Sequence, residues 1–126
     1  MTITATGMAE VAKLIGTDTT GGATAFDYIA IGTGTVAAVV GDTTLDAEEY
    51  RQAGTGTTVT TTQTNDTFQL QSTFSITGSH AITEAGVLNA GSNGVLLCRT
   101  TFAALNVVSG DSLTFTFKIQ VKQGAA

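Results

Sequence analysis

The segment ITEAGVLNAGSNGVLLCRTTF, residues 82–102, has the clearest structural pattern in this chain. Two apolar stretches, 82–90 and 95–102, flank the tetrad Gly-Ser-Asn-Gly at 91–94. Glycine and asparagine accept positive φ angles that other residues adopt only at a steric cost, so this tetrad favours a tight turn. The segment therefore predicts a β-hairpin around which the rest of the chain is built.

Closing the hairpin at this turn places Gly86 opposite Arg99 and Leu88 opposite Leu97. Glu84 then lies diagonal to Arg99 on the same face, within reach of a long side chain. A carboxylate in an apolar strand needs a partner, so we expect Glu84 and Arg99 to form an ion pair that fixes the register. The alternative is that one or both side chains reach across a subunit boundary.

Period-two alternation of apolar residues predicts most of the other strands. The residues 57–64 and 68–76 read as a second hairpin joined at Asn65-Asp66, and 113–121 alternates with five apolar residues on one face, Val121 being the last. The residues 26–31 read as a buried strand, and 109–111 as a turn. The chain is thus expected to be one mainly β domain, 1–126: an antiparallel β-sandwich or small barrel with one or two short helices.

Two stretches have helical character. Residues 7–15 carry Met8, Val11 and Ile15 at helical spacing, and we expect this stripe to pack on the sheet. A second short helix is predicted within 44–53. Residues 1–6 are interpreted as an edge strand or an N-terminal arm, 17–24 as a loop and 123–126 as a loose tail.

The composition limits the possible partners. The 126 residues include 15 Gly, no Pro and few charged side chains, and the net charge is −5. Such a chain has no basic patch for nucleic acid and no Lys/Arg cluster for an anionic membrane, so neither is an expected partner. Neither a secretory signal nor a membrane-spanning run is evident, so we expect synthesis in a cytoplasm. With few charges or prolines to protect strand edges, we expect the edges to be covered by other subunits.

No pattern of catalytic, cofactor-binding or metal-ligating residues emerges, and we expect no enzyme activity. The glycines at 32–37 match a dinucleotide-binding fingerprint, but the β-branched residues that follow are unsuited to the helix which that site requires. Asp46, Glu48 and Glu49 are interpreted as a solvated acidic face, and His80 as an isolated loop or edge residue. The single cysteine, Cys98, is expected to be a small buried apolar residue.

Six motifs in order resemble a group of small virion proteins of tailed bacteriophages. They are YIAIGTGT (28–35), TLDAEEYR (44–51), TNDTFQLQSTFSITG (64–78), ITEAGVLNA (82–90), LLCRTTF (96–102) and GDSLTFTFKI (110–119). The same pattern is similar to the N-terminal region of phage tail-collar fibre proteins. Leu88 stands where an aromatic residue is usual, and Phe117 lies near the position of a common tryptophan.

This resemblance implies a virion component and assigns no catalytic residue. Because the pattern fills the whole chain, the leading expectation is a capsid decoration (cement) protein on the virion surface. It would be trimeric, would bind the major capsid protein, and would offer Thr2 and Ile3 in its N-terminal arm as lattice contacts. The alternatives are a small tail, baseplate or fibre-attachment component and, more remotely, a carbohydrate-binding module, which two tyrosines and no tryptophan equip poorly.

Overall fold

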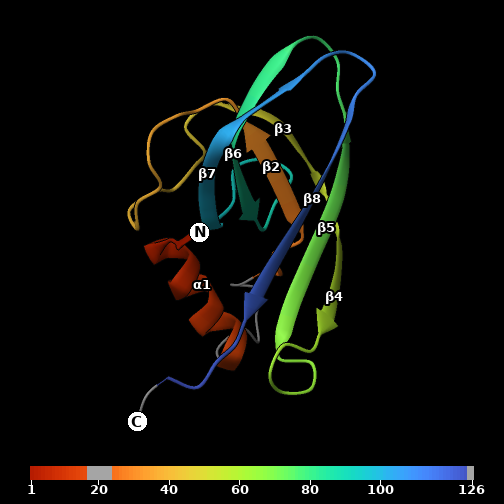
Figure 1. The fold of residues 1–126 in the computed structure, drawn as a ribbon. Helices are drawn as coiled ribbons and strands as arrows, with labels where there is room; N and C mark the ends of the chain where they lie inside the picture. Colours follow the sequence, from red (N-terminus) through yellow and green to blue (C-terminus); the bar gives the residue numbers. More distant parts are fainter. Residues whose placement is uncertain (17–23, 125–126) are drawn as a thin grey trace.

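Two antiparallel β-sheets and one helix make up the fold in the computed structural model, which describes residues 1–16 and 24–124 (Figure 1). The five-stranded sheet has the order β1 (Thr2–Ile3), β7 (Leu96–Val107), β6 (His80–Leu88), β2 (Tyr28–Gly32) and β3 (Glu48–Ala53). The three-stranded sheet has the order β4 (Thr55–Val59), β5 (Thr67–Ser75) and β8 (Ser112–Gln120), and the helix is α1 (Ala5–Gly16). The predicted mainly β, sandwich-like fold is confirmed; the described strands do not close into a barrel.

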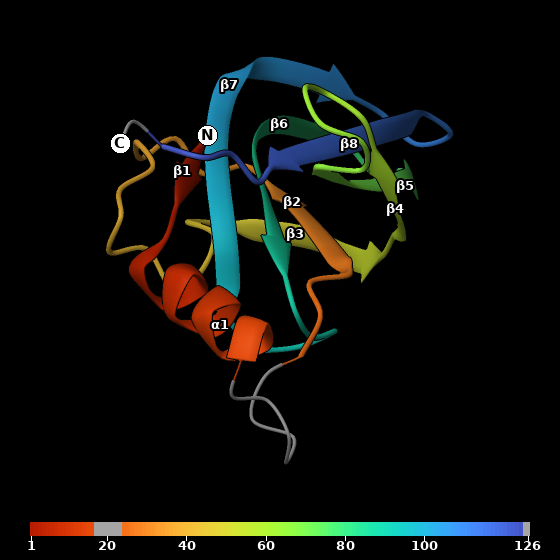
Figure 2. The same cartoon turned by 90° about the horizontal axis from the view of Figure 1, so that it is seen from below.

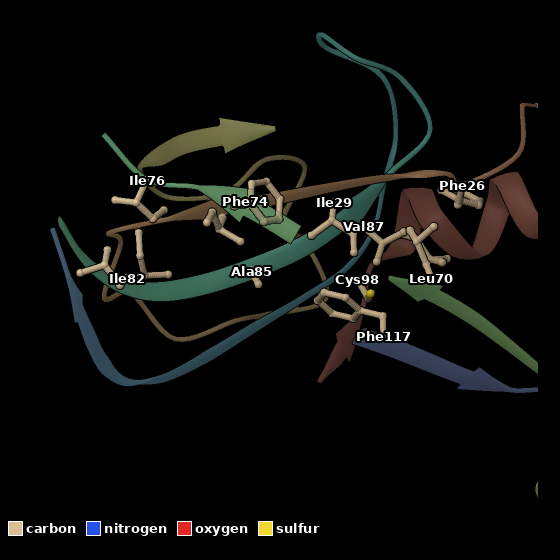
Figure 3. Packing of buried hydrophobic residues seen from close by; sticks show 13 residues of the cluster. Phe26, Ile29, Leu70, Phe74, Ile76, Ile82, Ala85, Val87, Cys98 and Phe117 are labelled. Atoms are coloured by element: carbon tan, nitrogen blue, oxygen red, sulfur yellow. The ribbon is translucent and has the colours of Figure 1, made fainter. Parts of the chain in front are cut away.

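The hydrophobic core lies between the two sheets. Apolar side chains of β2 and β6, such as Ile29 and Val87, meet Leu70 and Phe74 of β5 and Phe117 of β8 (Figure 3). Each of these five residues is at most 6% exposed. Burial of residues from both layers is the main stabilising contribution to a two-layer fold of this kind.

The central hairpin forms as predicted, with one difference in register. Asn93 and Gly94 adopt φ angles of 54° and 78° in the turn, and Gly86 is paired with Arg99. Leu88, however, is paired with Leu96 and not with Leu97, because the ladder shifts between Val87 and Leu88. A bulge of this kind adds a residue to one strand, and counting outward from the turn cannot reveal it.

Helix α1 is longer than expected and presents a different face to the sheet. The Thr4 hydroxyl caps it by accepting a hydrogen bond from the Gly7 amide at 2.9 Å. Within the helix only Gly7 and Glu10 are buried, whereas Met8 and Ile15 are 51% and 82% exposed. The prediction that the apolar stripe packs on the sheet is therefore wrong.

Close approach of the helix to β7 explains this orientation. Figure 2 shows α1 at the end of β7 where that strand begins. A Cβ atom added at Gly7 would lie 2.7 Å from the Leu97 Cα atom, so only glycine fits there. The helix thus turns its smallest residue, and not its largest apolar ones, toward the strand.

The second predicted helix, 44–53, is wrong as well. Residues 33–47 form no helix or regular strand. Residues 48–53 form β3, whose Ala53 and Tyr50 are paired with Tyr28 and Ile31 of β2. The Arg51 guanidinium donates hydrogen bonds to the carbonyls of Ala90 and Asn93 at 3.0 and 2.8 Å. These contacts with a distant turn outweigh a weak local preference for helix.

The second hairpin and the last strand form as predicted, but β4 is shorter than expected, and β5 and β8 each begin and end one residue earlier. Strand β4 ends at Val59, and the connection to β5 contains Asn65 at a φ of 58°. Gly110, at a φ of 94°, makes the predicted turn before β8. Val121 lies beyond β8 and is 81% exposed, so its predicted place in the core is wrong.

The structure describes only part of the two segments predicted to be a loop and a loose tail. Of the predicted loop 17–24, residues 17–23 lie outside the described residues, as do 125 and 126 of the predicted tail. No helix in the described part of the chain is long and apolar enough to cross a membrane.

Candidate functional site

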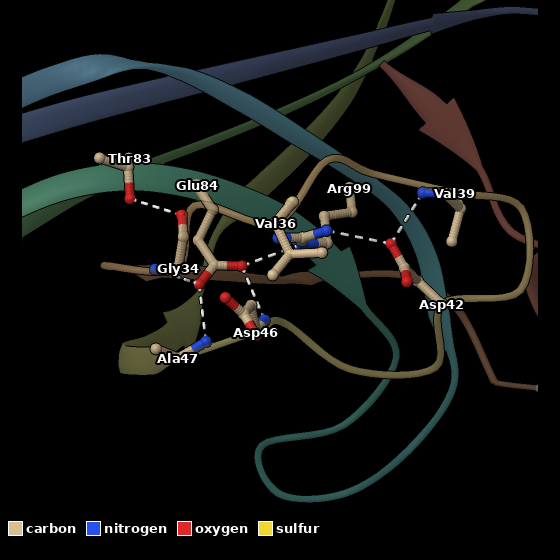
Figure 4. Close-up of polar contacts among 9 residues, drawn as sticks. All are labelled: Gly34, Val36, Val39, Asp42, Asp46, Ala47, Thr83, Glu84 and Arg99. Atoms are coloured by element: carbon tan, nitrogen blue, oxygen red, sulfur yellow. Dashed lines mark hydrogen bonds and ion pairs between the residues drawn. The ribbon is translucent and has the colours of Figure 1, made fainter.

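The ionised pair predicted from the hairpin lies at the centre of the five-stranded sheet. Glu84 on β6 and Arg99 on β7 are 0% and 2% exposed, and the Arg99 Nε atom lies 2.9 Å from Glu84 Oε1 (Figure 4). The predicted pairing is confirmed. Within the described residues, every buried side-chain nitrogen and oxygen has a hydrogen-bond partner.

The Glu84 carboxylate also binds the backbone of the long 33–47 connection. Its Oε2 atom accepts hydrogen bonds from the amides of Gly34 and Ala47, both at 2.7 Å. Its Oε1 atom accepts a third from the Asp46 amide at 2.8 Å. One side chain thus holds both ends of a connection that has no regular structure of its own.

The Arg99 guanidinium holds the middle of the same connection. It donates to the Val36 carbonyl at 2.7 Å and pairs with Asp42 Oδ2 at 3.1 Å. Asp42 in turn accepts a hydrogen bond from the Val39 amide at 3.0 Å. We call Glu84, Arg99 and Asp42 the ionic centre; its contacts fix the 33–47 connection against the sheet.

Both buried members of the ionic centre are held in their charged forms. Burial of Glu84 opposes ionisation, but hydrogen bonds from the Ala47 and Asp46 amides, Arg99 and the Gly34 amide outweigh it, so the pKa of Glu84 lies below its ordinary value. Burial of Arg99 likewise disfavours its charge, yet Glu84 and Asp42 raise the pKa of the guanidinium. The pair is stable as an ion pair and is not poised to transfer a proton.

The glycines of the 32–37 segment serve this packing. A methyl group at Gly32 would overlap the Ala47 carbonyl, and one at Gly34 would overlap Glu84 Oε2 and the Asp46 side chain. No helix begins after these glycines, so the geometry that binds a pyrophosphate is not formed. The fingerprint match therefore reflects close backbone approach to the ionic centre.

The residues considered for metal or acid–base chemistry are dispersed. Glu48 pairs with Arg51 at 2.6 Å, and Glu49 lies 3.8 Å from His80 Nδ1. The His80 ring also contacts Tyr50 edge-on. His80 is the first residue of β6, an inner strand of the five-stranded sheet, and lies beside Glu49, so the prediction of an isolated loop or edge residue is wrong. In residues 1–16 and 24–124, no group of three or more His, Cys, Asp and Glu side chains is placed to hold a metal ion.

The single cysteine is fully buried. Cys98 is 0% exposed within the core, as predicted, and this burial raises the pKa of its thiol to about 11. A thiol with so high a pKa is almost entirely protonated near neutral pH and is a poor nucleophile.

Thr2 and Ile3 form β1, with Thr2 paired with Arg99 and Ile3 with Cys98. Of the two interpretations of the N-terminus, an edge strand or an arm, the structure shows the edge strand, and both residues are half-buried. Their use as lattice contacts, and any contact of Glu84 or Arg99 with a second subunit, stay predictions.

A surface that the sequence analysis missed lies beside α1. An apolar groove of about 550 Å³ opens where the sandwich ends, between the helix, segment 25–27 and the three-stranded sheet. Its lining includes Val11, Leu14, Phe26, Phe68, Leu97 and Ile119. The signal that could have found it is the pair Gly7 and Glu10, one helical turn apart, which mark the sheet-facing side and leave the apolar stripe facing outward.

Comparison with known proteins gives no assignment. No protein-family model, curated protein or solved structure matches the chain.

Proposed function

We propose that this chain is a structural protein of a bacteriophage particle, seated as a decoration protein on the capsid lattice. The observation that carries the proposal is the apolar groove together with the outward-facing residues of α1. Val11 and Leu14 are 37% and 40% exposed in the groove, next to Ile15 at 82%. A concentrated apolar surface of this kind is typical of a site that a neighbouring protein covers.

The chemistry of the buried polar groups supports the same proposal. The charged groups of Glu84 and Arg99 form hydrogen bonds with the backbone of the 33–47 connection, and the thiol of Cys98 is buried and protonated. A rigid body with apolar contact surfaces is suited to mechanical work. Because it would bind the assembled shell and not free capsid subunits, its binding would stabilise the shell by mass action.

The order of the six motifs supplies the link to tailed phages, and the same proposal includes self-association and contact with the major capsid protein. A place in the tail or baseplate would use the same surfaces at far lower copy number. Copy number therefore separates the two locations.

The test is to purify particles of the phage that encodes the chain and to measure, by quantitative mass spectrometry, its copies relative to the major capsid protein. We expect a fixed ratio to the capsid protein, and lower thermal stability of the shell in particles that lack the chain. Restoring the purified chain should restore that stability. A few copies per particle would contradict the capsid location and support the tail alternative; absence from the particle would contradict the whole proposal.

A further inference from the structure

Strand β8 is the least protected edge of the two sheets. Of the other three edge strands, β1 has two residues, β4 has five, and β3 carries the charges of Glu48, Glu49 and Arg51. By contrast, β8 has nine residues, which keep unbroken register with β5 from Ser112 to Gln120. No other described strand is paired with β8, so its outer side presents the longest regular row of free backbone donors and acceptors.

The side chains of this edge are incompletely covered. Leu113, Phe115 and Ile119 point toward the core but remain partly exposed, whereas Leu70 and Phe74 on the neighbouring β5 are at most 1% exposed. These three side chains of β8 are thus covered less completely than Leu70 and Phe74 of β5. A further strand beside β8 would cover these three side chains.

The sequence of β8 indicates which strand could pair with its free edge. Residues 113–119 read Leu-Thr-Phe-Thr-Phe-Lys-Ile, which is nearly the same from either end, with Thr116 at the centre. Two identical strands related by a twofold axis pair antiparallel, so each residue meets the one at the mirrored position. A strand with this symmetry is complementary to itself.

We propose that β8 pairs antiparallel with β8 of a second copy of this chain, with Thr116 on the twofold axis. In this register Phe115 lies opposite the second copy's Phe117, and Leu113 opposite its Ile119, on the core face. Thr114 lies opposite the second copy's Lys118 on the outer face, so no like charges are paired directly. The two three-stranded sheets become one of six strands.

The outer face of the sheet continues across this contact. Thr114 shares a hydrogen bond with Thr73 of β5 at 2.8 Å, and Thr116 accepts one from the Gln71 side chain at 2.9 Å. Both threonines are exposed, so they are available to a neighbouring strand on that face. The inference goes beyond the virion assignment and does not depend on it, since it concerns only the contact between two copies. A twofold contact joins copies in pairs and therefore differs from the trimer that the family resemblance implies.

The test is Thr116→Lys, which brings two ammonium groups directly opposite one another at the axis. The matched controls are Thr73→Lys, on the same exposed face but on the inner strand β5, and Thr57→Lys, on the opposite edge strand β4. By light scattering coupled to size exclusion, we expect the native chain and both controls to have at least twice the 12.8 kDa mass of one chain. For the Thr116→Lys variant we expect half the molar mass of the native assembly, and a circular dichroism spectrum that is the same as that of the native chain.

Cross-linking tests the same contact by a positive signal. Thr116→Cys should form a disulfide-linked dimer under mild oxidation, because its partner is the same residue of the other copy, whereas Thr73→Cys should not. The native Cys98 thiol, buried and protonated, provides the unreactive background. A chain that remains monomeric at about 1 mM would overturn the proposal. Loss of mass in Thr57→Lys and not in Thr116→Lys would overturn it in favour of β4.

Discussion

The ionic centre and the apolar groove are two regions of the same molecule that differ in how their side chains are shielded from water. In the ionic centre, Glu84 and Arg99 are removed from water, and each polar atom has a partner inside the chain. In the groove, Val11 and Leu14 remain partly exposed to water with no described residue above them.

The difference follows from the cost of each kind of exposure. An unpaired buried charge costs several kcal/mol, so a polar site must be completed by the fold itself. Exposed apolar surface costs only about 25 cal/mol per Å², so it can remain open until another protein covers it. The ionic centre is therefore expected to control stability, and the groove to control association.

The largest expected effect is that of removing the Glu84 charge. Glu84→Gln leaves Arg99 buried without its main partner and sets an amide N–H₂ group among backbone N–H donors, so the free energy of unfolding should fall by about 3–5 kcal/mol. Urea unfolding of the native chain and of Glu84→Gln measures this difference in the free energy of unfolding.

Glu48→Gln is the matched control, because the Glu48–Arg51 pair lies at the partly exposed edge strand β3. That substitution should cost less than about 1 kcal/mol. If both variants lost stability equally, the ionic centre would have no special role.

A smaller loss is expected where the backbone approaches the ionic centre. Gly34→Ala would place a methyl group against Glu84 Oε2 and the Asp46 side chain, and should lower the free energy of unfolding by about 1–3 kcal/mol. Gly41→Ala has open space around the new methyl group, so thermal unfolding should detect a change of at most about 0.5 kcal/mol. Equal effects would contradict the steric explanation.

Acid should weaken the ionic centre in a defined direction. The pKa of Glu84 is lowered in the folded chain, so its contribution to stability is fully present above its ordinary pKa of 4.5 and is lost as pH falls through the lower folded value. Chemical unfolding measured from pH 6 downward should show this slope in the native chain and lose part of it in Glu84→Gln.

Asp66 provides the comparison at the surface. Hydrogen bonds, first from the Gln63 amide and also from those of Thr61 and Thr62, lower the pKa of Asp66 despite partial desolvation. Asp66→Asn should therefore remove a separate part of the acid slope and leave the part due to Glu84. A slope that neither substitution changes would show that other carboxylates determine acid stability.

The smallest effect on stability is expected in the groove. Leu14→Glu replaces one good helix former by another at a partly exposed position, so the free energy of unfolding should change by no more than about 0.5 kcal/mol. Binding of the fluorescent dye ANS, which reports exposed apolar surface, should nevertheless fall. Ile15→Glu, more exposed and outside the groove lining, should leave dye binding unchanged. Similar dye binding in both variants would show that the groove does not bind the dye.

Much of the fold was readable from local patterns. The Gly-Ser-Asn-Gly turn fixed the β6–β7 hairpin, and period-two alternation marked β5 and β8, because both signals depend on neighbouring residues alone. The pairing of Glu84 with Arg99 was predictable as well, since few charged residues compete for a partner in this chain.

The errors lie where distant contacts override local preference. Residues 48–53 have helical character, yet they add a strand beside β2, where Arg51 reaches the turn of the central hairpin. The apolar stripe of α1 predicted a buried face, but the tight contact of Gly7 with Leu97 rotates that stripe outward.

Local sequence patterns were thus enough to predict the hairpins, the class of fold and the charged pair, because turn residues and alternating side chains act within a few positions. Three features became evident only from the three-dimensional arrangement: Glu84 and Arg99 hold the 33–47 connection, α1 leaves an apolar groove open, and β8 lies at the edge of its sheet. Each of these depends on which elements meet in space, and that is set by packing between segments far apart in the chain.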